Sequence, residues 1–349
     1  MRIFLVMLVA MAGFPAMATA ESPRIELSSV HDWLLLLNND LEADVVAKIA
    51  ASDYDMIVID DVSSQKGNDA TKSSSVVARL REKADGSPRL VFAYLNIGQA
   101  EDYRRYWKTG WRAGAPGFIL GTDPEGWQGN YPVAYWRKAW KSRITGPDGI
   151  LHQIQRAGFD GVYLDWIGGY EDEHVLAAAR RDHINARSEM IKWVADISRT
   201  AKRNSRAFLI IAQNAAGLLA DDAYVGAIDG VAHEDIWFTG ADGGPSGDCP
   251  VPRSQTELSA RSFLLRLDDE CLRAFRANVA GAMHFPAYEA VVPVLQAVLR
   301  KAKPVFTVDY ARRLNNVNEV QRESRALGFV PFVGLRELSS YVAPVDALD

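Results

Sequence analysis

The sequence is poor in cysteine, in clustered basic charge and in long apolar runs. Its two cysteines, Cys249 and Cys271, allow one disulfide that would close a loop and contribute roughly 3 kcal/mol, so the cysteine count does not decide the function. The net charge is −5 and the basic residues do not cluster, so nucleic acid is not an expected partner. Beyond the N-terminus no stretch is apolar enough to span a bilayer, and no stable membrane insertion is expected.

Several catalytic and cofactor-binding motifs are also missing. The six histidines form neither an H-x-H nor an H-E-x-x-H pair, so a zinc site is not expected. No G-x-S-x-G motif supplies a serine nucleophile, and no strand-like run is followed by the G-x-G-x-x-G turn of a dinucleotide-binding fold. We therefore expect no cofactor and no metal ion.

The N-terminus has the pattern of a secretory signal peptide. An apolar run from Ile3 to about Val9 follows Arg2, and small residues end the segment at Ala20. The run is too short for a membrane anchor, and glycine and proline interrupt it soon afterwards. We predict a signal peptide over residues 1–20, one domain over residues 21–349, and a secreted or periplasmic location.

The rest of the chain alternates between short apolar runs and amphipathic segments. Each run is apolar throughout, as parallel strands buried on both faces are, and helical segments lie between the runs. This alternation predicts a single-domain (β/α)8 barrel, the TIM barrel, rather than a doubly wound sheet. We also predict one long helical tract over residues 173–203. The eight predicted strands are residues 33–37, 54–59, 90–95, 159–164, 207–212, 228–232, 305–308 and 329–333.

Two connections are unusually long. From Glu101 to Trp140, after the third strand, five tryptophans and several turn signals predict an aromatic-rich loop with short helices lying over the strand ends. A loop of this length inside a compact domain is usually functional. The stretch from Thr239 to Phe285, after the sixth strand, is predicted to be an insertion beside the cleft.

Polar side chains end or follow nearly every predicted strand. In a parallel barrel the carboxyl ends of all strands meet at one rim, which is where active sites are built, so we expect these side chains to converge. A single aspartate at such a position often caps a helix or anchors a loop, but a ring of carboxylates and amides has few purely structural explanations. The residues are Asp60, Asp61, Asn96, Asp165, Gln213, Asn214, Glu234, Asp309 and Arg336.

Two of these carboxylates are the best candidates for catalysis. Asp165 and Glu234 each end a buried strand abruptly, and each lies near a tryptophan in the sequence. Glycoside hydrolysis needs one protonated carboxyl to donate to the leaving oxygen and one ionised carboxylate. Nine tryptophans and twelve tyrosines also suit sugar recognition, because aromatic rings stack on pyranose faces. The aromatic candidates for substrate binding are Tyr94, Trp127, Trp136, Trp166, Trp237 and Tyr310.

Five segments share their pattern with a known family. They are YLNIGQAEDYR beginning at Tyr94, GVYLDW beginning at Gly161, the Gln213-Asn214 strand end, the segment around Glu234, and GFVPF beginning at Gly328. Together they resemble glycoside hydrolase family 114, the endo-α-1,4-polygalactosaminidase-like barrels. The resemblance covers nearly all of the mature chain. It implies a retaining endo-hydrolase of α-1,4-linked galactosamine-containing exopolysaccharide, with Asp165 as nucleophile and Glu234 as general acid/base.

The residues leave two other functions open. A barrel that binds exopolysaccharide without cleaving it would keep the aromatic loop but could lose either catalytic carboxylate, whereas both are present here. A glycosidase acting on another α-linked glycan would keep both. Charge complementarity with the acidic rim favours a cationic, partly deacetylated galactosaminoglycan as the polysaccharide partner.

Overall fold

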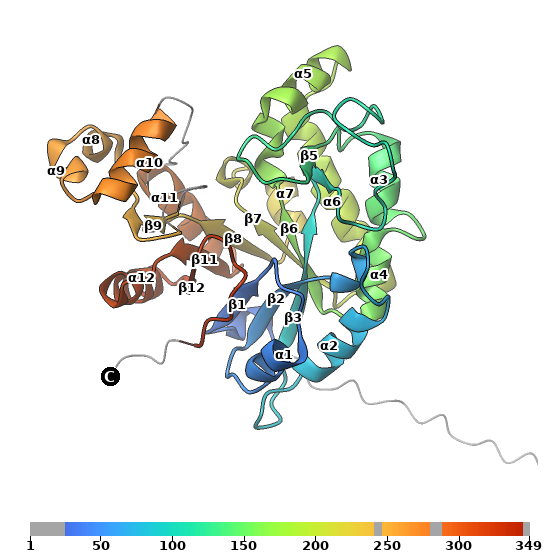
Figure 1. Ribbon diagram of the computed structural model, residues 1–349, viewed down its shortest axis with the longest axis horizontal. Coiled ribbons are helices and arrows are strands. Elements are labelled where there is room, and N and C mark those ends of the chain that lie inside the picture. The colour runs from blue at the N-terminus through green and yellow to red at the C-terminus, as the bar shows by residue number, and fades with distance from the viewer. Residues whose placement is uncertain (1–24, 241–245, 280–287, 345–349) are drawn as a thin grey trace, which may run out of the picture.

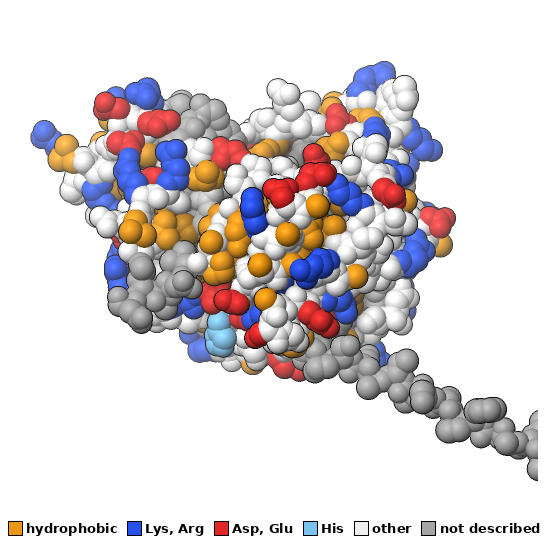
Figure 2. Space-filling model, turned by 60° about the horizontal axis from the view of Figure 1, so that its bottom comes forward, with side chains coloured by type: hydrophobic (Ala, Val, Ile, Leu, Met, Phe, Trp, Pro, Cys, Tyr) orange, Lys and Arg blue, Asp and Glu red, His pale blue; other side chains and the backbone are white. Residues whose placement is uncertain are grey.

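The computed structural model describes residues 25–240, 246–279 and 288–344. The predicted signal peptide lies outside the described residues. In the part of the chain that is described, no helix is long and apolar enough to cross a membrane. On the face seen in Figure 2, Lys and Arg side chains are scattered among Asp and Glu around a central group of hydrophobic side chains. This mixed surface agrees with the absence of a basic cluster in the sequence.

The centre of the molecule is a sheet of eight parallel strands that curls into a nearly closed TIM barrel (Figure 1). The strands are buried along almost their whole length, because their apolar side chains meet the barrel interior on one face and helices on the other. All eight predicted strands are present, each within two residues of its predicted bounds. In their order around the barrel they are β1 (Trp33–Leu36), β2 (Met56–Asp60), β3 (Leu90–Asn96), β6 (Gly161–Asp165), β7 (Leu209–Gln213), β8 (Gly230–Glu234), β11 (Val305–Tyr310) and β12 (Val330–Gly334).

Aromatic rings fill the interior where the barrel closes. The Trp33 ring packs against Tyr163, Phe306 and Phe332, with centroid distances of 6.2, 5.4 and 5.7 Å. Its indole nitrogen donates to the Val330 carbonyl oxygen at 3.0 Å, which ties β1 to β12 across the seam. Large buried rings contribute most of the apolar area that stabilises such a core.

Helices cover the outside of the barrel. They are α1 (Ala43–Ala50), α2 (Lys72–Leu80), α3 (Lys138–Thr145), α4 (Ile150–Ala157), α5 (Glu173–Arg181), α6 (Ala186–Asn204), α7 (Asp222–Ala227), α11 (Tyr288–Leu299) and α12 (Leu314–Ala326). Short 3-10 turns are η1 (Leu27–Ser29), η2 (Val62–Ser64), η3 (Ile167–Glu171) and η4 (Ala216–Leu218). The prediction of one helical tract over residues 173–203 is wrong: His183 takes a φ of 56°, which interrupts the tract, and Asn185 then caps α6 by accepting from the Ser188 N–H.

The long connection after β3 is built differently from the prediction. Instead of short helices, it contains a small antiparallel pair, β4 (Gln99–Glu101) with β5 (Asn130–Pro132), with a series of turns between the two strands and a short turn before α3. Several of its rings pack on one another. The ring centroids of Trp107 and Tyr131 are 4.7 Å apart, and those of Trp111 and Phe118 are 5.3 Å apart. Most of its aromatic side chains therefore stabilise the loop itself.

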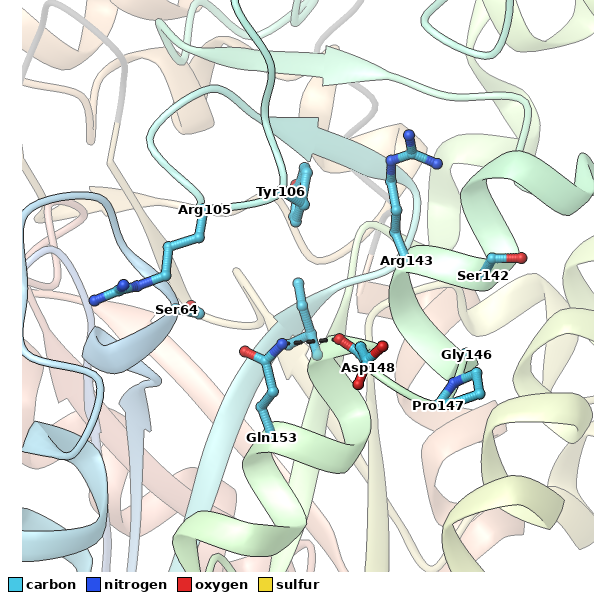
Figure 3. Close-up of a pocket in the computed structure, with 10 residues that line it drawn as sticks. Ser64, Arg105, Tyr106, Ser142, Arg143, Gly146, Pro147, Asp148 and Gln153 are labelled. Atoms are coloured by element: carbon cyan, nitrogen blue, oxygen red, sulfur yellow. Dashed lines mark hydrogen bonds between the residues drawn. The ribbon is translucent and has the colours of Figure 1, made fainter.

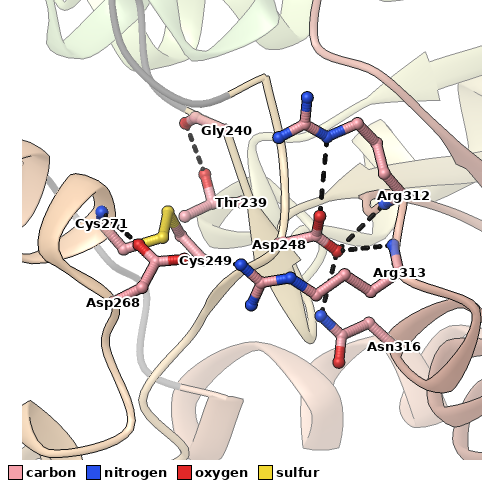
Figure 4. The surroundings of a disulfide bond; sticks show 9 residues. All are labelled: Thr239, Gly240, Asp248, Cys249, Asp268, Cys271, Arg312, Arg313 and Asn316. Atoms are coloured by element: carbon pink, nitrogen blue, oxygen red, sulfur yellow. Dashed lines mark hydrogen bonds and ion pairs between the residues drawn. A yellow bond between two sulfur atoms is a disulfide. The ribbon is translucent and has the colours of Figure 1, made fainter.

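The insertion after β8 stands to one side of the barrel (Figure 1). Its elements are β9 (Phe238–Thr239), β10 (Cys249–Pro250), α8 (Gln255–Leu258), α9 (Arg261–Leu264) and α10 (Asp269–Val279). A disulfide joins Cys249 to Cys271, so the bond that the sequence allowed is formed (Figure 4). Beside it, the Asp248 carboxylate accepts from the backbone N–H groups of Arg312 and Arg313, both at 3.0 Å. These bonds attach the insertion to the segment that follows β11.

Candidate active site

The strands that carry the central candidates leave the sheet through a strained turn. The residue that follows β6, β7 or β8 has a positive φ in each case: 59° at Trp166, 56° at Asn214 and 57° at Asp235. Residues other than glycine rarely adopt this left-handed conformation, and such strain is concentrated at functional sites. The last residues of these three neighbouring strands are Asp165, Gln213 and Glu234, and they lie at one rim.

Asp165 is a carboxylate in a place that disfavours its charge. Burial raises its pKa to about 7, and the negative charge of Glu234 acts in the same direction. The Tyr94 hydroxyl opposes this rise, because it donates to Asp165 Oδ2 at 2.5 Å and so favours the ionised form. Among the described residues, the only side chain that donates a hydrogen bond to Asp165 is therefore the neutral hydroxyl of Tyr94.

Glu234 is surrounded by donors. The side-chain amides of Gln213 and Asn214 both donate to its Oε2, the second at 2.9 Å, and the Tyr310 hydroxyl donates to its Oε1. Asn214 also accepts from the Glu234 N–H at 3.0 Å, so its side chain is held at both ends. Four of the sequence candidates thus form one hydrogen-bonded group around the end of β8.

Asp165 and Glu234 act on each other across the end of β7. Strand β7 pairs with both β6 and β8, so the two carboxylates flank it at the same rim. Their mutual repulsion contributes to the raised pKa of Asp165. Two carboxyl groups at one rim of a parallel barrel, one of them with a raised pKa, are suited to acid–base chemistry.

The Trp166 ring packs closely against two glycines. A Cβ atom added at Gly98 would come within 2.8 Å of the Trp166 ring, and one added at Gly169 within 2.2 Å. The indole is therefore seated closely against the segments that follow β3 and β6, next to Asp165. Only glycine at these two positions leaves room for the ring.

Comparison with known proteins identifies the family of this barrel. The model of glycoside-hydrolase family GH114 matches residues 17–347. The chain belongs to family GH114. A protein of Deinococcus radiodurans is 31% identical over 326 residues, covering 93% of this chain and 86% of its own length. Another from Thermotoga maritima is 30% identical over 273 residues, covering 76% of both chains.

Solved structures share the GH114 fold seen here. The glycoside hydrolase domain of PelA from Pseudomonas aeruginosa gives a TM-score of 0.56 at 13% identity, covering 89% of this chain and 97% of that one. Ega3 from Aspergillus fumigatus, solved in complex with galactosamine, gives 0.56 at 15% identity, covering 91% and 97%. At these identities the likeness concerns the fold.

Two candidates after β2 have structural partners in this GH114 barrel. Asp60 accepts from Arg104 and from the Gln65 side-chain amide, each at 2.7 Å. Arg104 is buried, and it also binds Glu101 at 2.7 Å. Asp61 accepts from the Ser73 hydroxyl at 2.6 Å, and burial raises its pKa. These carboxylates hold η2, α2 and the start of the long loop together.

Two further candidates do not join the hydrogen-bonded group around Glu234. Asp309 is fully buried and its Oδ1 accepts from the N–H groups of Trp237, at 2.6 Å, and Phe238, at 3.0 Å, so it anchors the turn after β8. The Trp237 ring is buried, and its indole nitrogen donates to Ser324 of α12. The interpretation of Trp237 as a substrate-binding ring is therefore corrected: its ring packs between the barrel and α12.

Trp136 has partners on the outer ring of helices. Its indole nitrogen donates to Asp182 Oδ2 at 2.8 Å, beyond the end of α5, and its ring packs on Tyr135 with centroids 5.1 Å apart. Neither partner belongs to the group around Asp165 and Glu234. These contacts place Trp136 between α3 and α5, and its assignment to substrate binding stays a prediction.

The remaining candidates meet where the long loop crosses the barrel mouth. Arg336, which follows β12, places its guanidinium 5.8 Å from the Trp127 ring centroid and 3.5 Å from Glu125 Oε2. Trp127 is 36% exposed, so it has a free surface for a ligand. Asn96 donates to Gln99 at 3.0 Å, and Gln99 in turn donates to Asp123.

Sequence reasoning missed Gln99, Asp123 and Glu125. Gln99 stood in the segment that resembled the family, three residues after a strand end. Asp123 stood in a turn signal, where an aspartate often accepts from N–H groups that follow it. The signals were present, but they did not show that the turn reaches the mouth.

A pocket of about 270 Å³ lies on the flank of the barrel, away from this group (Figure 3). Its walls come from η2, the start of the long loop, and the segment that joins α3 to α4. None of its lining residues is a strand-end candidate. In the described part of the chain, no three His, Cys, Asp or Glu side chains are grouped to hold a metal ion.

Proposed function

We propose that the protein is a secreted or periplasmic retaining endo-glycoside hydrolase that cleaves α-1,4-linked galactosamine-containing polysaccharide. Membership of GH114 and the pair formed by Asp165 and Glu234 support this proposal. The observation that carries it is the pairing itself: two coupled carboxylates, each held by a tyrosine hydroxyl, at the open rim of a TIM barrel. The likeness to Ega3, solved with galactosamine, supports the substrate class.

In the first step of the proposed mechanism, ionised Asp165 attacks the anomeric carbon. The bond to the glycosidic oxygen breaks, and Glu234 gives its proton to that oxygen as the leaving chain departs. In the second step, Glu234 takes a proton from water, and the oxygen of that water attacks the anomeric carbon and displaces Asp165. The net reaction consumes one water and regenerates both carboxyl groups.

The hydrogen bonds around Glu234 suit a group that gains and loses a proton. The amide nitrogens of Gln213 and Asn214 can only donate, so they bind Glu234 as an acceptor in either protonation state. A protonated Glu234 can donate to the Tyr310 hydroxyl, which accepts as well as donates, or to the glycosidic oxygen of a bound substrate. The Tyr310 hydroxyl thus accepts the hydrogen bond of protonated Glu234 until a substrate oxygen replaces it.

Bound substrate also favours the required distribution of protons. A cationic galactosamine unit near Asp165 stabilises the ionised form of this carboxylate by Coulomb attraction. The first step needs Asp165 in this ionised form. Charge complementarity of this kind favours a deacetylated galactosaminoglycan over a neutral glycan.

The test uses purified protein with α-1,4-galactosamine polymers of defined acetylation. We expect oligomers of mixed size, as an endo-hydrolase gives, and NMR of the first-formed product showing the retained α-anomer. Asp165→Asn should abolish turnover on every substrate. Glu234→Gln should cleave an activated aryl glycoside, whose leaving group needs no proton, and added azide should accelerate that reaction.

A control and two outcomes define the test. Glu42→Gln removes an exposed carboxylate that pairs with Lys72 at 3.0 Å, and it should leave activity unchanged. Binding of the polymer without any cleavage would support the binding-only alternative. Near-normal polymer hydrolysis by Glu234→Gln would show that the general acid is a different residue.

Export is tested separately. Cleavage after Ala20 removes 20 residues, so the mass of the protein recovered from the periplasm or medium should correspond to residues 21–349. A full-length chain retained in the cytoplasm would contradict the proposed location.

A further inference from the structure

The loop that crosses the barrel mouth presents a carboxylate and an indole two residues apart. The Glu125 side chain is 60% exposed, and Trp127 is also exposed. Glu125 lies close enough to Asp165 for its charge to act on that carboxylate. An indole face packs on a pyranose ring, and an adjacent carboxylate binds an ammonium group.

The position of this pair is fixed by hydrogen bonds. Asp123 Oδ1 accepts from the N–H groups of Glu125, at 2.8 Å, and of Trp127, at 2.9 Å, which closes the turn. The other oxygen of Asp123 accepts from the side-chain amide of Gln99. The turn is therefore attached directly to the end of β4, and it does not depend on a ligand for its shape.

The same network continues to the catalytic carboxylate. Gln99 accepts from Asn96 at 3.0 Å, and the Asn96 amide also lies 3.5 Å from the Tyr94 hydroxyl, which donates to Asp165. A chain of four side chains thus connects Asp165 to the turn. Such a connection holds the turn in register with the reacting atoms, as a subsite next to the cleavage point requires.

We propose that Glu125 is a specificity-determining residue, which binds the ammonium group of a deacetylated galactosamine unit while Trp127 packs on the ring of that unit. The proposal rests on the proposed function and names the residues that distinguish the deacetylated unit from the acetylated one. An acetamido group carries no charge, so it gains nothing from this carboxylate. Glu125 therefore discriminates between the deacetylated and the acetylated unit, whereas Trp127 contributes to the binding of both.

Arg336 holds the Glu125 position in the absence of substrate. Its guanidinium lies 3.5 Å from Glu125, and it also acts electrostatically on Asp235, beside Glu234. The Arg336 guanidinium also lies 5.8 Å from the Trp127 ring centroid, so an incoming ammonium can replace it at Glu125 while Arg336 keeps this contact. The exchange is one cation for another on a partly exposed carboxylate.

The experiment compares the ratio of kcat/KM for fully deacetylated and fully N-acetylated α-1,4-galactosamine oligomers. In Glu125→Gln this ratio should fall about three- to tenfold, the effect of a partly exposed ion pair. In Glu42→Gln, which removes an exposed carboxylate with its own ion pair, the ratio should stay at the wild-type value. Raising the salt concentration from about 50 to 500 mM should lower the ratio of the wild type towards that of Glu125→Gln.

Trp127→Ala provides a second measurement. This substitution should lower kcat/KM for both oligomers by a similar factor, because ring stacking does not depend on the acetylation of the amine. An unchanged ratio in Glu125→Gln, or a wild type that prefers the acetylated oligomers, would overturn the assignment of Glu125 and leave the hydrolase proposal intact. Absence of cleavage of both oligomers by the wild type would instead refute the proposed function.

Discussion

Replacing Tyr94 with phenylalanine tests the electrostatics of the proposed catalytic pair, Asp165 and Glu234. The Tyr94 hydroxyl donates to Asp165 at 2.5 Å and opposes the rise in pKa that burial imposes. Phenylalanine keeps the ring and removes only the donor. The ionised form of Asp165 then loses its neutral hydrogen-bonding partner, so the pKa of this carboxyl should rise above about 7.

The size of the shift follows from the strength of the lost bond. A hydrogen bond to a charged group contributes about 1.5–3 kcal/mol, and one pKa unit corresponds to about 1.4 kcal/mol. The pKa of Asp165 should therefore rise by about one to two units. Because the nucleophile must be ionised, the rising limb of kcat/KM against pH should move to higher pH by the same amount.

The assay is the pH profile of kcat/KM on an activated aryl galactosaminide. Tyr163→Phe is the matched control: the Tyr163 hydroxyl is buried on the same strand as Asp165, two residues earlier, and has no hydrogen-bond partner among the described residues. Removal of that hydroxyl should leave the limb in place. If Tyr94→Phe lowers activity by one factor at every pH, the hydroxyl only positions Asp165 and the electrostatic argument is refuted.

Three other predictions concern stability. Arg104→Met should lower the free energy of unfolding by about 3–5 kcal/mol in urea denaturation, because it leaves the buried carboxylates of Asp60 and Glu101 without their cation. Burial raises the pKa of Asp309 to about 7, so the folded state binds an extra proton: this contribution to stability is full below about pH 4 and is lost as the pH rises through 7. The melting temperature should therefore depend less on pH between about 4 and 7 in Asp309→Asn than in the wild type. Equal slopes of melting temperature against pH in the two proteins would contradict this prediction. Reduction of the Cys249–Cys271 disulfide, monitored by thiol labelling and mass spectrometry, should cost about 3 kcal/mol for a separation of 22 residues.

The barrel was predictable because its signals are local. Each strand is a short run of apolar residues, and the residue that ends the run is polar in most of them. Register in a parallel sheet then places those ends at one rim without any further information. Asp165, Gln213 and Glu234 could be assigned to a common site on that basis, before any distance was known.

What the sequence did not predict depends on contacts between distant segments. Asp309 looks like the catalytic candidates in the sequence, but its partners are N–H groups of the turn after β8, more than 70 residues earlier. Trp237 follows Glu234 closely, yet its ring is turned towards α12 and binds Ser324. Neither partner carries a periodic pattern, so no local rule identifies it.

The long loop shows the same limit. Its tryptophans predicted a surface for sugar, but Trp107 and Trp111 pack within the loop. Trp127 differs because Asp123 closes a turn beneath it and Arg336 meets it from the other side of the mouth. Composition suggested the presence of binding rings, and only the packing distinguishes which ring is available.

The strand-end carboxylates separate into two groups according to what compensates their charge. Asp60 has a buried arginine that balances its charge, and Asp309 is bound by the N–H groups of the turn after β8, so both carboxyl groups are committed to structural partners. Among the described residues Asp165 accepts from the Tyr94 hydroxyl and from the Trp166 backbone, both of them neutral groups, and burial together with the repulsion of Glu234 raises its pKa to about 7. A carboxylate that must attack a sugar and then release it cannot be bound to a permanent cation, because that cation would hold the charge in the ground state. Asp165 has no such cation among the described residues, so its charge is left for the substrate to balance, as its proposed role as nucleophile requires.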